Sequence, residues 1–170
     1  MPLFGDKLRF AAESDLASDP GGPWMFGRLR FWCGGLTVGD FDLGTSLRDA
    51  LFQLETVERY CRRRQSVRFA GTAAVQVFHL LDAALYGKWD IDNHMLAEQE
   101  EWARFNVLPD LDVFEGWKVF LLETPTAGRL ILSPAPYEAV GEVAVAPGEV
   151  DSVLRLETDY LRQQYAILTR

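Results

Sequence analysis

The stretch GDFDLGTS, residues 39–46, holds the side chains whose types and spacing look most able to do chemistry. Asp40 and Asp42 form an Asp-x-Asp pair, and carboxylate oxygens are the ligands that hard divalent cations prefer. The same stretch also fits a strand that turns into a helix, because Ser46 stands three residues before Asp49, close to a capping box. No nucleotide-binding βαβ pattern accompanies the aspartates. The sequence therefore favours the structural interpretation, with metal binding and partner contact as alternatives.

The two histidines are the next candidates for acid–base or metal chemistry. His79 lies in a strongly apolar stretch with Asp82 three residues later, which favours a half-buried structural histidine over a general base. His94 is followed by Glu98 and Glu101 at steps of four and seven, so one helix face would hold all three. A metal site is the alternative there, but no second histidine or cysteine supports it.

Familiar catalytic and cofactor motifs do not occur in the sequence. Residues 90–101 have the length of an EF-hand loop, but Met95 stands where that loop requires glycine. There is no G-x-S-x-G, P-loop or G-x-G-x-x-G. Cys33 and Cys61 are far apart, as expected for buried reduced thiols. The residues therefore predict no enzyme, no cofactor and no metal site, with a small enzyme of unrecognised site as an alternative.

Charge is distributed unevenly along the chain. Residues 90–115 carry eight carboxylates against Arg104, a net −7 of the chain's −8. Residues 48–68 carry six arginines against three acids, a net +3, and the run 62–64 suits the C-terminal end of a helix. Such an acidic run is either a solvated face or, with tryptophans interleaved, a face that binds a basic partner.

We take the second alternative as the site hypothesis, with Trp89 and Trp102 as aromatic anchors. The residues of this predicted partner-binding face are Trp89, Asp90, Asp92, Glu98, Glu101, Trp102, Asp110, Asp112 and Glu115. The first hairpin, around Arg28 and Arg30, is the alternative location.

The elements that must position these residues follow from periodicity. Residues 7–14, 24–33 and 36–42 are predicted strands, the last two joined by a Gly34-Gly35 turn. A helix follows with one apolar stripe. The stripe consists of Leu47, Ala50, Leu51, Leu54, Val57 and Cys61. Residues 69–86 are apolar on nearly every side and predict a central helix that ends at Gly87; residues 93–105 predict another helix.

The last third of the chain predicts three more strands and a final helix. The strands are residues 117–124, residues 129–133 and a segment within 137–146, with Gly141 a candidate for a bulge. Pro147-Gly148 then opens a helix. We therefore expect one α+β domain over residues 1–170, with antiparallel hairpins in the order βββα, αα, βββα and helices packed on the sheet. Whether the halves share one sheet stays open.

Length and composition fit a single globular domain. The chain has 170 residues, 48% of them hydrophobic, and its first ten residues lack the apolar core of a signal peptide. No run approaches the length of a membrane span. A net charge of −8 argues against a nucleic-acid ligand. We expect a cytoplasmic protein that binds neither nucleic acid nor membrane.

Four stretches resemble the bacterial immunity protein 42 family of polymorphic toxin systems. They are FGDKLRFA (4–11), FGRLRFWCGG (26–35) with VGDFDLGTSLRDALFQL (38–54), LDAALYG (81–87) and DVFEGWKVFLLE (112–123). They occur in order over most of the chain, and the long second motif is the most specific.

The resemblance implies a function that composition does not show. Members of this family bind a cognate secreted or contact-delivered toxin and block it by stoichiometric binding. The resemblance supplies no catalytic residues and no agreed toxin contacts, so the site hypothesis rests on charge and aromatic residues alone. A partner with a basic surface, such as a toxin that cuts nucleic acid, would suit an acidic face. A generic regulatory or ligand-binding domain is the remaining alternative.

Overall fold

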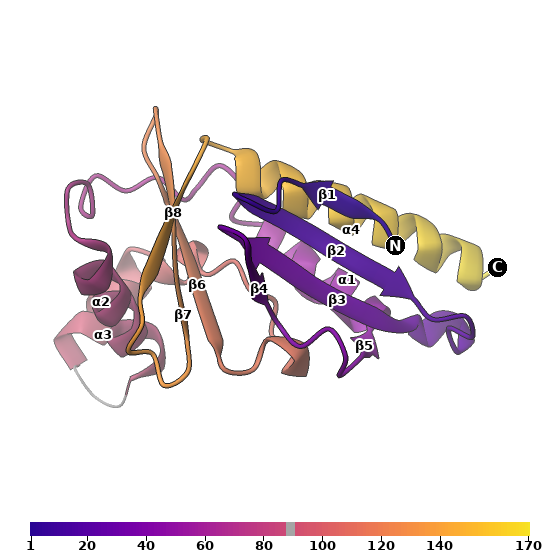
Figure 1. Ribbon diagram of the computed structural model, residues 1–170. Helices are drawn as coiled ribbons and strands as arrows, with labels where there is room; N and C mark the ends of the chain where they lie inside the picture. Colours follow the sequence, from indigo (N-terminus) through magenta and orange to yellow (C-terminus); the bar gives the residue numbers. More distant parts are fainter. Residues whose placement is uncertain (88–90) are drawn as a thin grey trace.

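The structure is a computed structural model that describes residues 1–87 and 91–170. The first part of the chain forms a five-stranded antiparallel sheet, called sheet A here (Figure 1). Its strands are β1 (Leu3–Gly5), β2 (Phe10–Leu16), β3 (Phe26–Cys33), β4 (Leu36–Val38) and β5 (Thr45–Ser46). β4 pairs with one end of β3 and β5 with its other end. The short strand β1 was not predicted, and β2 begins later than expected because residues 6–9 form the turn between them.

The alternation read from β3 is confirmed. Leu29, Phe31 and Cys33 are fully buried, whereas Arg28 and Arg30 lie on the opposite face of the strand. The β3–β4 turn needs backbone with positive φ, and its two glycines supply it with φ values of 60° and 82°. The returning strand β4 is shorter than predicted, so residues 39–44 leave the sheet before β5 rejoins it.

Two helices cover one face of sheet A. α1 (Leu47–Glu58) packs against β3, and α4 (Glu149–Leu168) lies along β1 and β2 and against α1 (Figure 1). The predicted apolar stripe of α1 is buried from Leu47 to Val57, while Cys61 lies beyond the end of the helix. Among the described residues, no helix covers the opposite face of sheet A (Figure 1).

The second part of the chain forms a separate three-stranded sheet, called sheet B. Its strands β6 (Trp117–Glu123), β7 (Gly128–Pro134) and β8 (Gly141–Val145) pair in chain order. Gly141 begins β8 in regular register with Leu132, so it marks no bulge. The expected α+β fold with antiparallel hairpins is thus confirmed, and the two halves do not share a sheet.

β6 and β7 are buried on both faces of sheet B, which explains why these two strands are largely apolar, whereas the edge strand β8 is partly exposed. Val119 and Leu121 belong to a core that also contains the inner residues of sheet A, α1 and α4. Phe120 and Leu122 belong to a second core built on α2 (Ala74–Tyr86). Sheet B therefore joins the two cores.

α2 is not the central helix that its composition predicted. It buries only Val77, Phe78, Leu81 and Ala84, and its other side is exposed at Val75 and Tyr86. Gly87 caps it with φ of −73° instead of the expected left-handed conformation. No helix in the described part of the chain is long and apolar enough to cross a membrane.

The predicted third helix is two elements. α3 covers Ile91–Gln99, and a short 3-10 turn, η2, follows at Trp102–Phe105. Two further 3-10 turns, η1 (Gly22–Trp24) and η3 (Asp112–Phe114), precede β3 and β6. Met95 on α3 is exposed.

The arginine run 62–64 does not simply finish a helix, because Arg64 is completely buried. Its Nε donates to Asp151 Oδ1 on α4 at 3.1 Å, and its Nη atoms donate to the carbonyls of Val57 and Asn106, each at 3.1 Å. This side chain ties together the end of α1, the segment before β6, and α4. α1 ends at Glu58 with no basic residue in its last turn, so the helix-end interpretation is wrong for the whole run 62–64.

Candidate partner-binding surface

The Asp-x-Asp stretch forms a turn and a helix cap. Asp40 Oδ1 accepts hydrogen bonds from the backbone N–H groups of Asp42 and Leu43 at 3.0 and 3.2 Å. Ser46 Oγ accepts from the N–H of Asp49 at 3.2 Å, so the predicted N-cap of α1 is confirmed. The side-chain oxygens of Asp40 and Ser46 thus stabilise the backbone of the turn and of the helix N-terminus.

The turn also brings Asp40 to the second half of the chain. Its N–H donates to the carbonyl of Val113, within η3, at 2.7 Å. This hydrogen bond holds the exposed residue Asp40 against η3, which begins with the exposed residue Asp112.

The histidines do not assemble a site. The side chain of His79 is exposed, not half-buried as expected. His94 Nε2 lies 3.3 Å from Glu98, but Glu101 lies beyond the end of α3 and forms an ion pair with Arg63 instead. Across the described residues, no three histidine, cysteine, aspartate or glutamate side chains converge as metal ligands would.

The predicted acidic face divides into two groups in space. Asp92, Glu98 and Glu101 are exposed on and just after α3. There Glu101 pairs with Arg63, and Glu100 pairs with Arg68 at 2.6 Å. The indole N–H of Trp102 and the Arg68 guanidinium lower the pKa of the Glu100 carboxyl.

These pairs join the acidic segment to the basic one, so the charge separation seen along the sequence is partly cancelled in the fold. Trp89 and Asp90, which belong to the predicted face, lie outside the described residues.

Trp102 needs a correction, because its side chain is 1% exposed and cannot anchor a partner from the surface. Its ring packs edge-on against Phe69 at 5.4 Å, and its Nε1 donates to Glu100 at 2.9 Å. A tryptophan side chain has a large apolar area, and the Trp102 side chain buries that area in the core beside α2.

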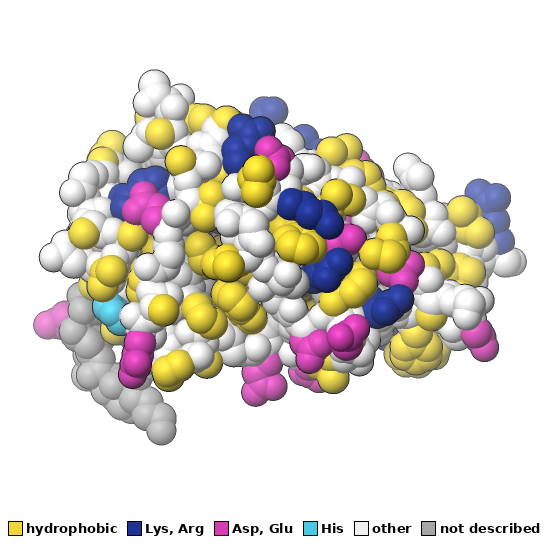
Figure 2. Space-filling model, in the orientation of Figure 1, with side chains coloured by type: hydrophobic (Ala, Val, Ile, Leu, Met, Phe, Trp, Pro, Cys, Tyr) yellow, Lys and Arg dark blue, Asp and Glu magenta, His cyan; other side chains and the backbone are white. Residues whose placement is uncertain are grey.

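The second acidic group consists of Asp110, Asp112 and Glu115, just before β6. All three are exposed, and none forms an ion pair with another described residue. They line a hollow of about 580 Å³ together with the aromatic rings of Tyr86 and Trp117. Acidic side chains are visible along the lower edge of the molecule in Figure 2.

The electrostatics of this hollow are acidic. Burial, followed by the nearby carboxylates of Asp82 and Asp110, raises the pKa of the Tyr86 phenol. Lys118 also lines the hollow, but it pairs with Asp82 and lies 4.0 Å from the ring centroid of Tyr137. The hollow therefore offers carboxylates and aromatic rings to a cationic group of a partner.

Two further hollows continue this surface. One of about 550 Å³ shares Asp110, Leu111 and Asp112 with the first and adds Asp49. The next, of about 920 Å³, shares residues 43–46 with the second. We call the three connected hollows the trough. Asp110, Asp112 and Glu115 were predicted from the sequence, but Asp15 and Asp49, which also line the trough, were not, and neither was the adjacency of the three hollows.

The alternative site around Arg28 and Arg30 is largely neutralised. Arg28 pairs with Asp15 at 2.7 Å and Arg30 with Glu13 at 2.8 Å, both across the β2–β3 ladder. The Arg30 guanidinium also lies over the rings of Phe41 and Trp32, 4.2 and 4.8 Å from their centroids. These arginines are engaged within the sheet, so they leave less charge for a partner than the exposed carboxylates of Asp110, Asp112 and Glu115 do.

Comparisons with known proteins agree with the fold and the motifs. The crystal structure of CdiI from Burkholderia dolosa AUO158 is similar, with a TM-score of 0.72 and 21% sequence identity, covering 95% of this chain and 99% of that one. A search of curated proteins finds no match. The description of the Immunity protein 42 family matches residues 1–157. This match covers most of the sequence, and the chain belongs to the Immunity protein 42 family.

Proposed function

We propose that this chain is an immunity protein that binds a cognate bacterial toxin and neutralises it by stoichiometric protein–protein interaction. The observation that carries the proposal is the family match over residues 1–157. The similarity to CdiI over nearly the whole of both chains supports the same fold. On this proposal residues 1–170 act as one domain in the cytoplasm, and the chain inhibits by occupying a surface of the toxin and not by a reaction of its own.

The surface that best suits such binding is the acidic part of the trough. Asp110, Asp112 and Glu115 are exposed carboxylates beside the aromatic rings of Tyr86 and Trp117. Aromatic anchors beside complementary charge are typical of tight protein interfaces. We therefore propose a toxin domain with a basic surface, and we assign Asp92, Glu98 and Glu101 a smaller contribution because arginines already neutralise part of the α3 group.

Charge attraction of this kind raises the association rate constant more than it raises the final affinity. Oppositely charged surfaces raise association rate constants toward about 10⁸ M⁻¹s⁻¹ at low salt. Rapid capture suits a protein that must intercept an incoming toxin before the toxin acts.

The experiment that tests the function uses the toxin domain encoded beside the gene for this chain. We expect the two proteins to purify together at equal stoichiometry, and expression of this chain to protect cells from that toxin. The toxin domain of an unrelated system serves as the control for specificity. A chain that neither binds its neighbouring toxin nor protects against it contradicts the proposal.

A further inference from the structure

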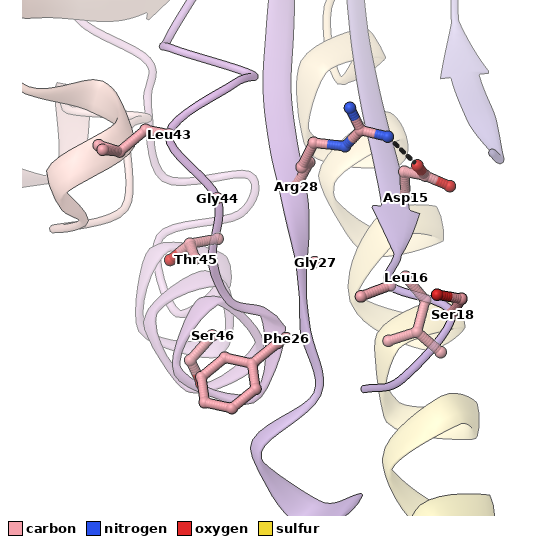
Figure 3. Close-up of a pocket in the computed structure, with 11 residues that line it drawn as sticks. Asp15, Leu16, Ser18, Phe26, Gly27, Arg28, Leu43, Gly44, Thr45 and Ser46 are labelled. Carbon is pink, nitrogen blue, oxygen red and sulfur yellow. Dashed lines mark hydrogen bonds and ion pairs between the residues drawn. The ribbon is translucent and has the colours of Figure 1, made fainter. Parts of the chain in front are cut away.

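The largest hollow of the trough has a different chemistry from its acidic neighbours. It lies over β3, between the end of β2 on one side and residues 43–46 on the other (Figure 3). Its walls include the apolar side chains of Leu16, Ala17, Phe26 and Leu43. One charged pair, Arg28 with Asp15 at 2.7 Å, stands at its edge (Figure 3). This end of the trough is therefore an apolar hollow.

The hollow follows from the strand pairing. β4 pairs with β3 only at residues 31–33 and β5 only at residues 26–27, so the chain between β4 and β5 departs from the sheet. Leu43, within this departing segment, is 57% exposed, and Phe26 on β3 is 50% exposed; both line the hollow. Exposed apolar side chains that gather around a concavity are a feature of binding surfaces, whereas scattered ones need no explanation.

The neighbouring hollow decides what kind of occupant fits. Residues 43–46 form a wall of both hollows, and the next one along carries Asp49, Asp110 and Asp112. A group that fills the apolar hollow therefore enters beside carboxylates. Asp49 pairs with Arg48 at 2.8 Å, whereas Asp110 and Asp112 have no ion-pair partner among the described residues. Charge complementarity selects a segment with lysine or arginine next to a large apolar side chain.

We propose that the trough takes a single segment of the toxin domain, with a large apolar side chain of the toxin in the apolar hollow and the adjoining basic side chains along Asp110 and Asp112. The inference rests on the proposed function, because it names the part of the toxin that the surface recognises. In this arrangement the apolar hollow slows dissociation of the bound toxin. The acidic hollows orient the approaching toxin and raise its association rate constant.

The chain offers closely matched controls for a test. Leu43→Ser and Phe26→Ser remove apolar walls of the hollow. Leu36→Ser and Phe52→Ser remove side chains that are 56% and 48% exposed and line none of the three hollows. Ala17→Trp, at an exposed position in the wall, fills the hollow without removing any native contact.

Affinity for the neighbouring toxin domain is measured by calorimetry, with folding of each variant checked by circular dichroism. We expect the two wall variants and Ala17→Trp each to weaken binding by roughly tenfold or more, mainly through faster dissociation. The two control variants stay within about twofold of wild type, the range of energetically neutral contacts.

The outcomes separate this inference from the function. Wild type that does not bind the toxin contradicts the proposed function itself. Wild-type binding that Leu43→Ser, Phe26→Ser and Ala17→Trp leave unchanged overturns only the assignment of the apolar hollow. Variants that alter self-association in sedimentation, with toxin affinity unchanged, assign the hollow to a second copy of this chain and also overturn it.

Discussion

Glu157 is a carboxylic acid that the fold holds away from water. It lies on the buried side of α4, fully inaccessible, and neither of its oxygens has a hydrogen-bond partner among the described residues. The nearby hydroxyl of Ser14, on β2, is also buried, with no hydrogen-bond partner of standard geometry in the part of the chain that the structure describes. Burial raises the pKa of the Glu157 carboxyl to about 7, and Ser14 offsets this only in part. The protonated acid is thus the form that the fold prefers.

This residue makes stability depend on pH. Below about pH 4.5 the acid is protonated in both folded and unfolded chains and adds no pH dependence to stability. As the pH rises from there to about 7 the unfolded chain releases its proton first, so the folded state loses stability by on the order of 3 kcal/mol, and the loss stays complete above pH 7. We expect Glu157→Gln to be more stable relative to wild type at pH 8 than at pH 5, as measured by urea unfolding.

Glu138→Gln is the control, because Glu138 is exposed. It should leave the pH dependence of wild type unchanged. Equal pH dependence of wild type and Glu157→Gln refutes the role given to burial.

At the level of single residues, the sequence predicted roles that depend on neighbouring residues better than it predicted which side chains are buried or exposed. The cap at Ser46 depends on residues within three positions of it, and it was predicted correctly. The buried Glu157 and the exposed His79 depend on which distant elements cover a helix face, and the sequence near each carries no signal of that.

At the level of elements, periodicity was sufficient wherever one face is buried. It predicted β3 and α1 because their apolar residues recur at the period of the element. It was insufficient for α2, whose apolar composition has no clear period and so does not show which side is covered. The order of elements was largely predictable, but the separation into two sheets was not, since strand pairing between distant segments leaves no local mark.

The burial of Arg64 was likewise not predictable, because it depends on contacts with distant segments. Its contribution to stability can be tested by substitution. Removing one partner of a buried ion pair leaves an uncompensated charge, which costs about 3–5 kcal/mol. We therefore expect Arg64→Gln to lower the free energy of unfolding by about that amount. Arg63→Gln, which breaks an exposed pair with Glu101, should cost no more than about 1 kcal/mol.

Urea unfolding at neutral pH measures both variants. Equal costs for Arg64→Gln and Arg63→Gln contradict the view that Arg64 joins α1, the segment before β6, and α4. A greater loss of unfolding free energy for Arg63→Gln than for Arg64→Gln would show that Arg63 is the arginine that stabilises the fold.

For the whole molecule, folding changes the meaning of the charge pattern. The acidic and basic segments meet through Arg63–Glu101 and Arg68–Glu100, so part of the acidic run is neutralised internally. Trp102, predicted as an anchor, is in the core. Asp92 on α3 stays exposed without an ion pair among the described residues. So do Asp110, Asp112 and Glu115, which lie beside a trough that no local pattern could reveal.

The central claim is that this trough captures a basic toxin, and the association rate constant tests it most directly. Stopped-flow mixing with the neighbouring toxin domain compares wild type with the double variant Asp110→Lys/Asp112→Lys. The control, Glu138→Lys/Asp159→Lys, changes the net charge equally at exposed positions outside the trough. We expect the trough variant to associate roughly tenfold or more slowly at low salt, with the difference shrinking at physiological salt, and the control to stay within about twofold of wild type. Equal association rates for the trough variant and the control, at both salt concentrations, would contradict the account.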